Sequence, residues 1–149
     1  MKVGTDAVLL ATLPQFTNIH SVLDIGTGTG VLSLMLTQQF PDAKITAIEL
    51  DDAAASQAAE NFAHSTWAAN MQVIQADFEV FNSTNTYDLI ISNPPFFTAS
   101  LPSEDIAKNR ARHAPANLLA NWIEKSSQLL NENGKIAIIL PESEAEINH

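Results

Sequence analysis

The sequence predicts an α/β fold with a doubly wound, Rossmann-like parallel sheet, formed by one domain that spans residues 1–149. Short apolar runs alternate with helical patterns along the chain, which is typical of parallel βαβ units. With 149 residues, 46% of them hydrophobic, the chain can bury one core but is short for two. A glycine-rich turn follows the first apolar run, where nucleotide-binding α/β folds carry one.

Each strand is predicted from a short apolar run between turn or helix signals. Five such runs occur, near Val22–Ile25, Lys44–Leu50, Met71–Ala76, Tyr87–Ser92 and Lys135–Leu140. Joined by right-handed crossovers, five parallel strands place a ligand beyond their carboxyl ends. A sheet that finished with the last of these runs would keep an unprotected edge. We therefore expect the sequence to be truncated before the last strands.

The predicted helices lie between these strands. The second is apolar nearly all round, as expected for a helix packed on a sheet, and Pro41 ends it. Asp51 or Asp52 can cap the third, and Asn133-Gly134 offers a left-handed C-cap for the fourth. The four predicted ranges are 5–13, 31–40, 51–63 and 115–133.

Composition excludes several classes of function. The chain has no cysteine, which excludes disulfides, thiolate metal sites and the covalent thiolate chemistry of carbon-5 pyrimidine methylation. The histidines have no metal-like spacing, so we expect no metal. No stretch approaches the ~20 apolar residues of a membrane span, and no signal peptide is evident, so we expect a cytoplasmic protein without a membrane partner. We also expect a monomer.

The charge of the chain bears on its partners. A formal net charge of −10 argues against broad nucleic-acid binding, because phosphate contacts need cations. Four basic side chains nevertheless lie within six residues, namely Lys108, Arg110, Arg112 and His113. They belong to the segment 94–114, which is longer than most connections, and loops of this length are usually functional or disordered. Such a cluster is consistent with an RNA-binding loop and also with an ordinary solvated loop face.

The glycine-rich turn favours one nucleoside cofactor over another. Gly26, Gly28 and Gly30 follow Asp24 at alternate positions, and glycines let a backbone turn tightly and approach a ligand closely. A pyrophosphate-binding turn would need glycine at position 31, which is Val31 here. A carboxylate beside the turn suits the sulfonium and ammonium groups of S-adenosylmethionine and would repel a dinucleotide. We therefore favour S-adenosylmethionine, with a nicotinamide dinucleotide and a purely structural turn as alternatives.

Further cofactor contacts are predicted where the next two strands end. Glu49 ends the second strand, close to the offset at which a carboxylate meets ribose hydroxyls. Asp77 follows the third strand and could accept from an adenine amino group while Phe78 packs on the ring, although Asp77 suits a turn or a helix cap equally well. The expected cofactor-binding set in this part of the chain is Asp24, Gly26, Thr27, Gly28, Gly30, Glu49, Leu50, Asp77 and Phe78.

The most informative motif is Asn93-Pro94-Pro95-Phe96, which directly follows the run Tyr87–Ser92. Asn93 supplies an amide oxygen and Pro94 a carbonyl, and the two prolines stiffen the chain so that both oxygens can point the same way. Phe96 offers an aromatic face. Such a corner can hold a planar amino group, as methylation of an exocyclic amine requires, so these four residues are the predicted catalytic site. A rigid turn that closes a strand is the alternative.

Several segments together resemble the bacterial tRNA(Val) adenine-37 N6-methyltransferase family, within the class I S-adenosylmethionine-dependent methyltransferases. They are Met1–Leu10, Leu23–Gly30, Asp88–Phe96, Ser100-Leu101 and Arg110–His113. The glycine turn is shared by many methyltransferases and the Asn-Pro-Pro-Phe tetrad by several amino-methylating families. Only the first and last segments are therefore narrowly diagnostic.

The resemblance implies N6-methylation of adenine 37, beside the anticodon of valine tRNA. It implies that Glu49 holds the cofactor's ribose and Asp77 its adenine, and that Asn93 touches both cofactor and target base. The basic cluster 108–113 would bind the tRNA. Family members usually carry residues before Met1 and a longer C-terminal portion, so we expect this sequence to be incomplete at both ends. The residues implied over the methionine end of the cofactor are Lys2, Gly4, Thr5 and Asp6.

Other functions stay open. A glutamine side-chain amide in a protein presents the same planar NH2 to the same acceptors, and the acidic composition suits a protein substrate better than RNA. The chain could also be a cofactor-binding module that is catalytically silent. A dinucleotide oxidoreductase is a third alternative, against which Val31 and the Asn-Pro-Pro-Phe motif both weigh.

Overall fold

A parallel sheet forms the centre of the structure, a computed structural model that describes residues 16–92 and 115–139. Its strand order is β3-β2-β1-β4-β5, so β1 lies in the middle. This confirms the predicted doubly wound α/β sheet. The predicted first helix, 5–13, lies outside the described residues. The strands are β1 (Ser21–Ile25), β2 (Lys44–Glu49), β3 (Met71–Gln75), β4 (Tyr87–Ser92) and β5 (Leu130–Ile138).

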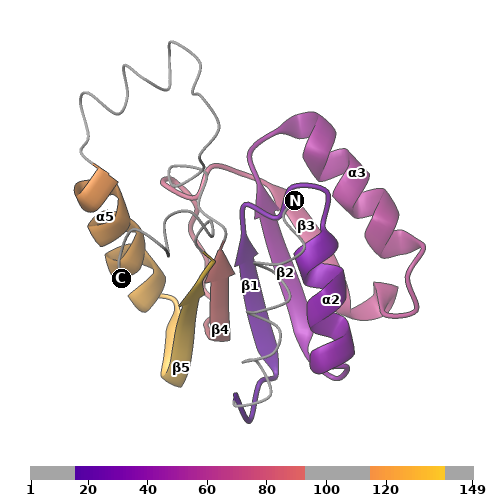
Figure 1. Ribbon diagram of the computed structural model, residues 1–149, viewed down its shortest axis with the longest axis horizontal. Helices are drawn as coiled ribbons and strands as arrows, with labels where there is room; N and C mark the ends of the chain where they lie inside the picture. The colour runs from indigo at the N-terminus through magenta and orange to yellow at the C-terminus, as the bar shows by residue number, and fades with distance from the viewer. Residues whose placement is uncertain (1–15, 93–114, 140–149) are drawn as a thin grey trace, which may run out of the picture.

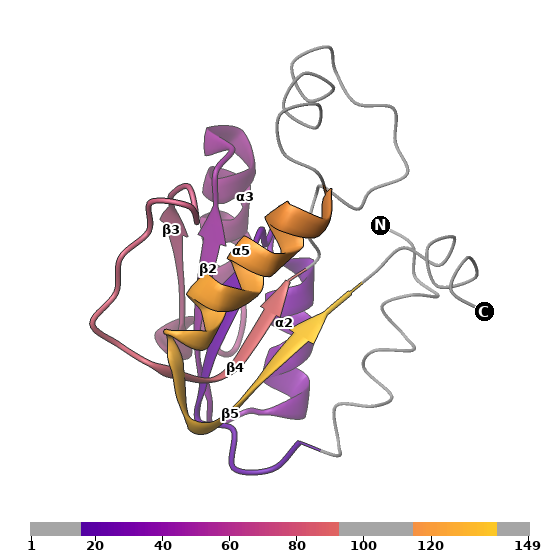
Figure 2. The same ribbon diagram turned by 90° about the vertical axis from the view of Figure 1, so that its left-hand side faces the viewer.

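Helices cover both faces of the sheet and give three layers (Figures 1 and 2). Helices α2 (Val31–Gln39) and α3 (Asp52–Ala63) lie on one face, and α5 (Pro115–Ser127) lies on the other. A short 3-10 helix, η2 (Ala68–Asn70), precedes β3. The β3–β4 connection contains no helix, so α5 is the only helix on its face within the described part of the chain, where Phe78 and Phe81 of that connection also pack.

Alternating side chains of β1 explain why the sheet needs both helical layers. Val22 is fully buried in a core shared with Leu36 of α2, whereas the next residue, Leu23, is buried in a core shared with Trp122 of α5. Successive residues of a strand point to opposite faces, and a parallel sheet hides both. The central strand is thereby fixed from both sides, which gives the loop that follows it a rigid base.

The helix ends around this loop agree with the predictions. Asp51 caps α3, because its side chain accepts a hydrogen bond from the Ala54 N–H at 2.8 Å. Helix α2 begins directly after Gly30 and ends at Gln39, just before Pro41. Both helices therefore start at the carboxyl edge of the sheet.

The boundary between α5 and β5 was predicted wrongly. Helix α5 ends at Ser127, and Gly134 lies inside β5 with a φ outside the left-handed region, so it is not a C-cap. The helix stops early because Leu129 is buried, 8% exposed, and its carbonyl accepts from the Tyr87 N–H at 2.8 Å. The pairing of β4 with β5 then shifts register between Tyr87 and Leu89. Burial and strand pairing thus outweigh the local Asn-Gly signal.

Candidate cofactor site

The glycine-rich turn lies between the end of β1 and the start of α2, and β2 holds it in place. The N–H groups of Gly26 and Thr27 both donate to the Ile48 carbonyl, at 2.8 and 3.0 Å. Gly26, Gly28 and Gly30 have φ values of 74°, 60° and 91°, the left-handed region that glycine adopts without strain. The alternate glycines in the sequence therefore correspond to alternate left-handed residues in the loop.

Two of these glycines have opposite surroundings. A Cβ on Gly30 would lie 2.5 Å from Phe62 Cε1, so Gly30 lets α3 pack closely against the loop. A Cβ on Gly28 would meet nothing within 4 Å. The backbone at Gly28 therefore faces open space, as a ligand that approaches the loop closely would require.

Glu49 ends β2 beside this open position. Its Oε1 accepts from the Gly28 N–H at 2.7 Å, and its Oε2 accepts from the Asp51 N–H at 2.9 Å. A carboxylate oxygen has further acceptor sites beyond one hydrogen bond, so Glu49 can still accept from hydroxyls of a ligand. This fits the predicted ribose contact, which stays a prediction.

Asp24 lies beneath the turn and is only 1% exposed. Its Oδ2 accepts from Ser33 Oγ at 2.6 Å and from Thr27 Oγ1 at 2.8 Å. Burial raises the pKa of Asp24 to about 6, the two hydroxyl donors oppose that rise, and the negative charge of Glu49 adds to it. Asp24 is therefore a buried acid whose charged form depends on two neighbouring hydroxyls.

The other residues predicted to hold the cofactor's adenosine part lie in different surroundings. Leu50 follows Glu49 and is 64% exposed, so its side chain can pack against a flat ligand. Asp77 Oδ1 accepts from the Glu79 N–H at 2.9 Å, which is the turn role considered above. The Phe78 ring lies 6.1 Å from the Trp122 ring and 5.2 Å from Lys125 Nζ. The structure thus places Phe78 against α5, and its contact with adenine stays a prediction.

The end of β4 lies next to the turn. Ser92 is 1% exposed, and its hydroxyl donates to the Ile25 carbonyl at 2.8 Å, which joins the carboxyl ends of β1 and β4. The predicted catalytic residues begin one position later in the chain. They lie outside the described residues, as do the cofactor contacts predicted near Met1 and the basic cluster. The residues concerned are Asn93, Pro94, Pro95, Phe96, Lys2, Gly4, Thr5, Asp6, Lys108, Arg110, Arg112 and His113.

Two hydrogen bonds around the turn were not predicted from the sequence. Ser33 interrupts an apolar helix, a signal that could have been noticed, and it is the partner of Asp24. Asn61 of α3 donates to the Thr29 carbonyl at 2.8 Å and ties the turn to a second helix. Nothing in the pattern indicates this second contact, because thirty-two positions separate the two residues.

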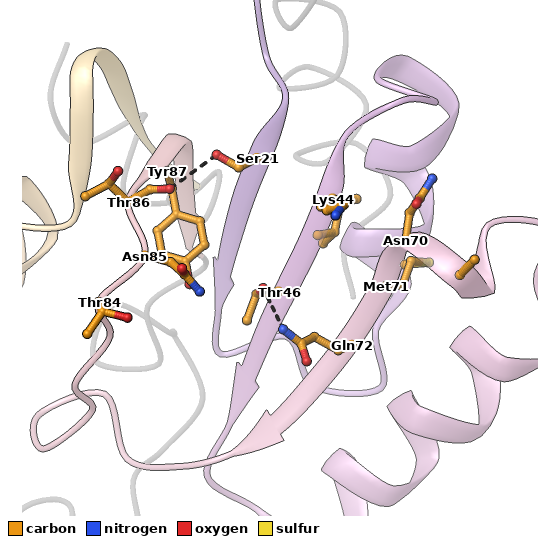
Figure 3. Close-up of a pocket in the computed structure, with 12 residues that line it drawn as sticks. Ser21, Lys44, Thr46, Asn70, Met71, Gln72, Thr84, Asn85, Thr86 and Tyr87 are labelled. Atoms are coloured by element: carbon orange, nitrogen blue, oxygen red, sulfur yellow. Dashed lines mark hydrogen bonds between the residues drawn. The ribbon is translucent and has the colours of Figure 1, made fainter.

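A groove of about 710 Å³ opens at the opposite edge of the sheet (Figure 3). Its lining includes the first residues of four strands, namely Ser21, Lys44, Met71 and Tyr87. Ligands of parallel α/β sheets bind beyond the carboxyl ends of the strands, so this groove is not the cofactor site. Over the two described ranges, no helix is long and apolar enough to cross a membrane, and no three His, Cys, Asp or Glu residues gather as a metal-binding group.

Comparison with known families agrees with this geometry. The family model for the methyltransferase small domain matches residues 2–145. The chain belongs to the methyltransferase small domain family. The match covers the described turn and the ends of β2 and β4, and it also includes the segment with the Asn-Pro-Pro-Phe motif.

Two curated relatives of this methyltransferase small domain carry the same name, tRNA1(Val) (adenine(37)-N6)-methyltransferase. The protein from Bacteroides thetaiotaomicron is 42% identical over 147 residues, which are 98% of this chain and 62% of the relative. The one from Glaesserella parasuis is 42% identical over 141 residues, which are 95% of this chain and 60% of the relative. The chain thus spans about three fifths of the curated relatives it matches.

Solved structures of methyltransferases share the fold of this small domain. The plantazolicin methyltransferase BpumL, in complex with a pentazolic desmethylPZN analog and SAH, aligns with a TM-score of 0.62 and 21% identity, over 91% of this chain and 44% of its own. The glycopeptide N-methyltransferase MtfA, complexed with S-adenosyl-L-methionine, aligns with a TM-score of 0.65 and 14% identity, over 88% and 48%. At such identities the likeness shows the shared α/β fold.

Proposed function

We propose that the chain binds S-adenosylmethionine and methylates N6 of adenine 37 in valine tRNA. The observation that carries the cofactor part is the open backbone at Gly28 beside the Glu49 carboxylate. The substrate part rests on the relatives of 42% identity that bear this activity in their names. The cytoplasm, where tRNA is modified, is the corresponding location, and a monomer without a metal is the proposed form.

The residues of the described site fit the cofactor in three places. Gly28 leaves room for close approach, Glu49 offers acceptors for ribose hydroxyls, and Leu50 offers an exposed apolar surface for adenine. Asp24 and Glu49 add negative charge, which favours a ligand with ammonium and sulfonium groups. When bound, S-adenosylmethionine supplies an electrophilic methyl group.

The chain's own contribution to the chemistry is to hold the amine. The lone pair of adenine N6 is delocalised into the ring, so acceptors must hold its hydrogens out of that geometry. Asn93 and the Pro94 carbonyl are proposed as those acceptors, and they also stabilise the positive charge that develops on N6. No general base is needed beforehand, because the proton can leave after the methyl group has moved.

The target base must leave its stack to reach such a site. Phe96 is proposed to stack on the flipped adenine, and Lys108, Arg110, Arg112 and His113 to contact phosphates of the anticodon loop. Neutralising Arg110 and Arg112 together should weaken tRNA binding and reduce its dependence on salt. An unchanged affinity and an unchanged salt slope would show that this cluster does not contact RNA.

The deciding experiment is tritium transfer from labelled S-adenosylmethionine to valine tRNA, followed by mass spectrometry of the nucleosides. The matched control is the same tRNA with guanosine in place of adenine 37. Methyladenosine in the first tRNA alone supports the proposal. Cofactor binding in calorimetry without transfer would indicate a silent module, and transfer to a glutamine-containing peptide instead of tRNA would indicate a protein substrate.

A further inference from the structure

Three polar side chains form a closed cluster under the glycine-rich turn. Ser33 is 0% exposed, Asp24 1% and Thr27 8%. Both hydroxyls donate to the same carboxylate oxygen, and they lie 3.4 Å from each other. Buried polar groups are costly unless they are satisfied, so these three residues depend on one another.

The cluster joins three parts of the site. Asp24 belongs to β1, Thr27 to the turn and Ser33 to the first turn of α2. The shortest contact is the one from Ser33, at 2.6 Å, the length of a charge-assisted hydrogen bond. Ser33 therefore does most to fix the Asp24 carboxylate in its charged form.

Few other charges face Asp24 in the described structure. Its strand neighbours are Ala47 of β2 and Ile91 of β4, and α2 carries no acidic or basic residue in either end turn. Glu49 is the titratable group that acts on it, and its effect is repulsive. Two carboxylates thus lie under and beside the turn, and a positive charge in the bound ligand would relieve their repulsion.

We infer that Ser33 is a positioning residue: with Thr27 it holds the Asp24 carboxylate ionised beneath the turn, and so makes the site prefer a cationic ligand to its neutral counterpart. S-adenosylmethionine carries a sulfonium, whereas S-adenosylhomocysteine has a neutral thioether in an otherwise closely similar molecule. The cluster therefore favours binding of the methyl donor over retention of its product. This inference rests on the proposed cofactor.

The test is calorimetry of both ligands with the full 149-residue chain between pH 5 and pH 8.5. For the wild type, affinity for S-adenosylmethionine should rise as the pH passes about 6, where Asp24 ionises, and affinity for S-adenosylhomocysteine should change less. Ser33→Ala removes one hydrogen bond to a charged group. At pH 7.5 this variant should weaken binding of S-adenosylmethionine roughly 10-fold and should weaken binding of S-adenosylhomocysteine roughly 3-fold or less.

Thr37→Val is the matched control. Thr37 lies one turn further along α2, is 1% exposed and donates to the Leu34 carbonyl at 2.5 Å, within its own helix. The variant loses a buried hydroxyl that makes no hydrogen bond to Asp24. The ratio of its affinities for S-adenosylmethionine and S-adenosylhomocysteine should therefore equal that of the wild type. A carbon-detected NMR titration of the free chain gives a second measurement, in which Ser33→Ala should raise the Asp24 midpoint and Thr37→Val should not.

The outcomes separate this inference from the proposed function. If the wild type binds neither ligand, the proposed function fails and the inference with it. If the wild type binds both, but Ser33→Ala keeps the wild-type ratio of affinities and the wild-type pH profile, only the inference is overturned. Should Ser33→Ala fail to fold, Asp24→Asn decides, because removal of the charge must lower the preference for the cation.

Discussion

The backbone N–H of Gly28 donates to Glu49 Oε1 at 2.7 Å and thereby joins the loop after β1 to the end of β2. This single hydrogen bond brings together two features that lie twenty-one positions apart in the sequence. It places an open stretch of backbone beside a carboxylate that keeps unused acceptor capacity.

Glu49→Gln should lower affinity for S-adenosylmethionine roughly 10-fold, because hydrogen bonds from ribose hydroxyls lose their charged acceptor. The amide oxygen can still accept from Gly28, whereas the exposed Asp51 N–H loses its side-chain acceptor, so the free energy of unfolding should fall by only about 1 kcal/mol. Calorimetry and urea denaturation measure the two effects. Glu60→Gln, at an exposed position of α3, is the control. Equal affinities for all three proteins would rule out Glu49 as a ligand contact.

Alanine at Gly28 and at Gly30 should have opposite consequences. Gly28→Ala places a methyl group in open space at φ +60°, so stability should fall by only about 1–2 kcal/mol while cofactor binding is blocked. Gly30→Ala drives a methyl group into the buried Phe62 ring at φ +91°, which should cost about 2–4 kcal/mol. Urea denaturation and calorimetry on both variants check this. Retained binding in Gly28→Ala would show that the ligand does not approach there.

Asp24→Asn should change the pH dependence of stability in a defined direction. The pKa of Asp24 is raised from 3.8 to about 6, so the folded state holds its proton more tightly than the unfolded state does. Ionisation therefore costs stability as the pH rises from about 4 to 6, by about 3 kcal/mol in total at 1.36 kcal/mol per pH unit. The asparagine variant lacks this loss, so its unfolding free energy relative to wild type should rise over that window and stay level above it.

Asp88 supplies the contrast within the same protein. Burial would raise its pKa, but hydrogen bonds from the Asn131 side chain and the N–H groups of His20 and Ser21 outweigh that effect and lower it. Its stabilisation is present at neutral pH and is lost as the pH falls through the lowered pKa. Wild type and Asp24→Asn both contain Asp88, so its contribution cancels when their free energies of unfolding are subtracted. If that difference in free energy did not change between pH 4 and pH 7, the raised pKa of Asp24 would be contradicted.

Leu50→Ala and Phe78→Ala should separate ligand contact from packing. Leu50 is 64% exposed, so its loss should leave stability nearly unchanged and weaken cofactor binding if adenine packs on it. Phe78 contacts Trp122 and Lys125, so its loss should cost stability, by about 2–4 kcal/mol for a partly buried aromatic side chain. Thermal denaturation and calorimetry distinguish the two. Weakened binding in Phe78→Ala without loss of stability would favour the predicted adenine contact instead.

Asn93→Ala should reduce the rate of methyl transfer by roughly 10²-fold, typical of losing one charge-stabilising group, and should lower cofactor affinity far less. Asn85→Ala, at an exposed position of the β3–β4 connection, is the control. Single-turnover transfer and calorimetry provide the two measurements. Equal losses of rate and cofactor affinity would contradict the assignment of Asn93 to the amine.

The sequence was sufficient for β1–β4 and for the edge of the sheet at which the glycine-rich turn lies. Apolar runs located β1–β4 to within a residue, because strands with buried or partly buried apolar side chains leave a pattern that is local in sequence. The α5–β5 boundary escaped because Leu129 and Tyr87 meet only in the folded chain. Ser33 stands out as a polar residue in an apolar helix, but its partner Asp24, like the Thr29 partner of Asn61, is defined only by the tertiary structure.

The central position of β1 also dictates the order in which the protein can assemble. During synthesis, β1 can pair with β2 soon after both strands have emerged from the ribosome. The other edge of β1 stays unpaired until β4 has been synthesised. The hydrogen bond from the Ser92 hydroxyl of β4 to the Ile25 carbonyl of β1 joins residues that are sixty-seven positions apart. Such non-local pairing makes folding slow and leaves a nascent strand edge exposed to other chains in the meantime.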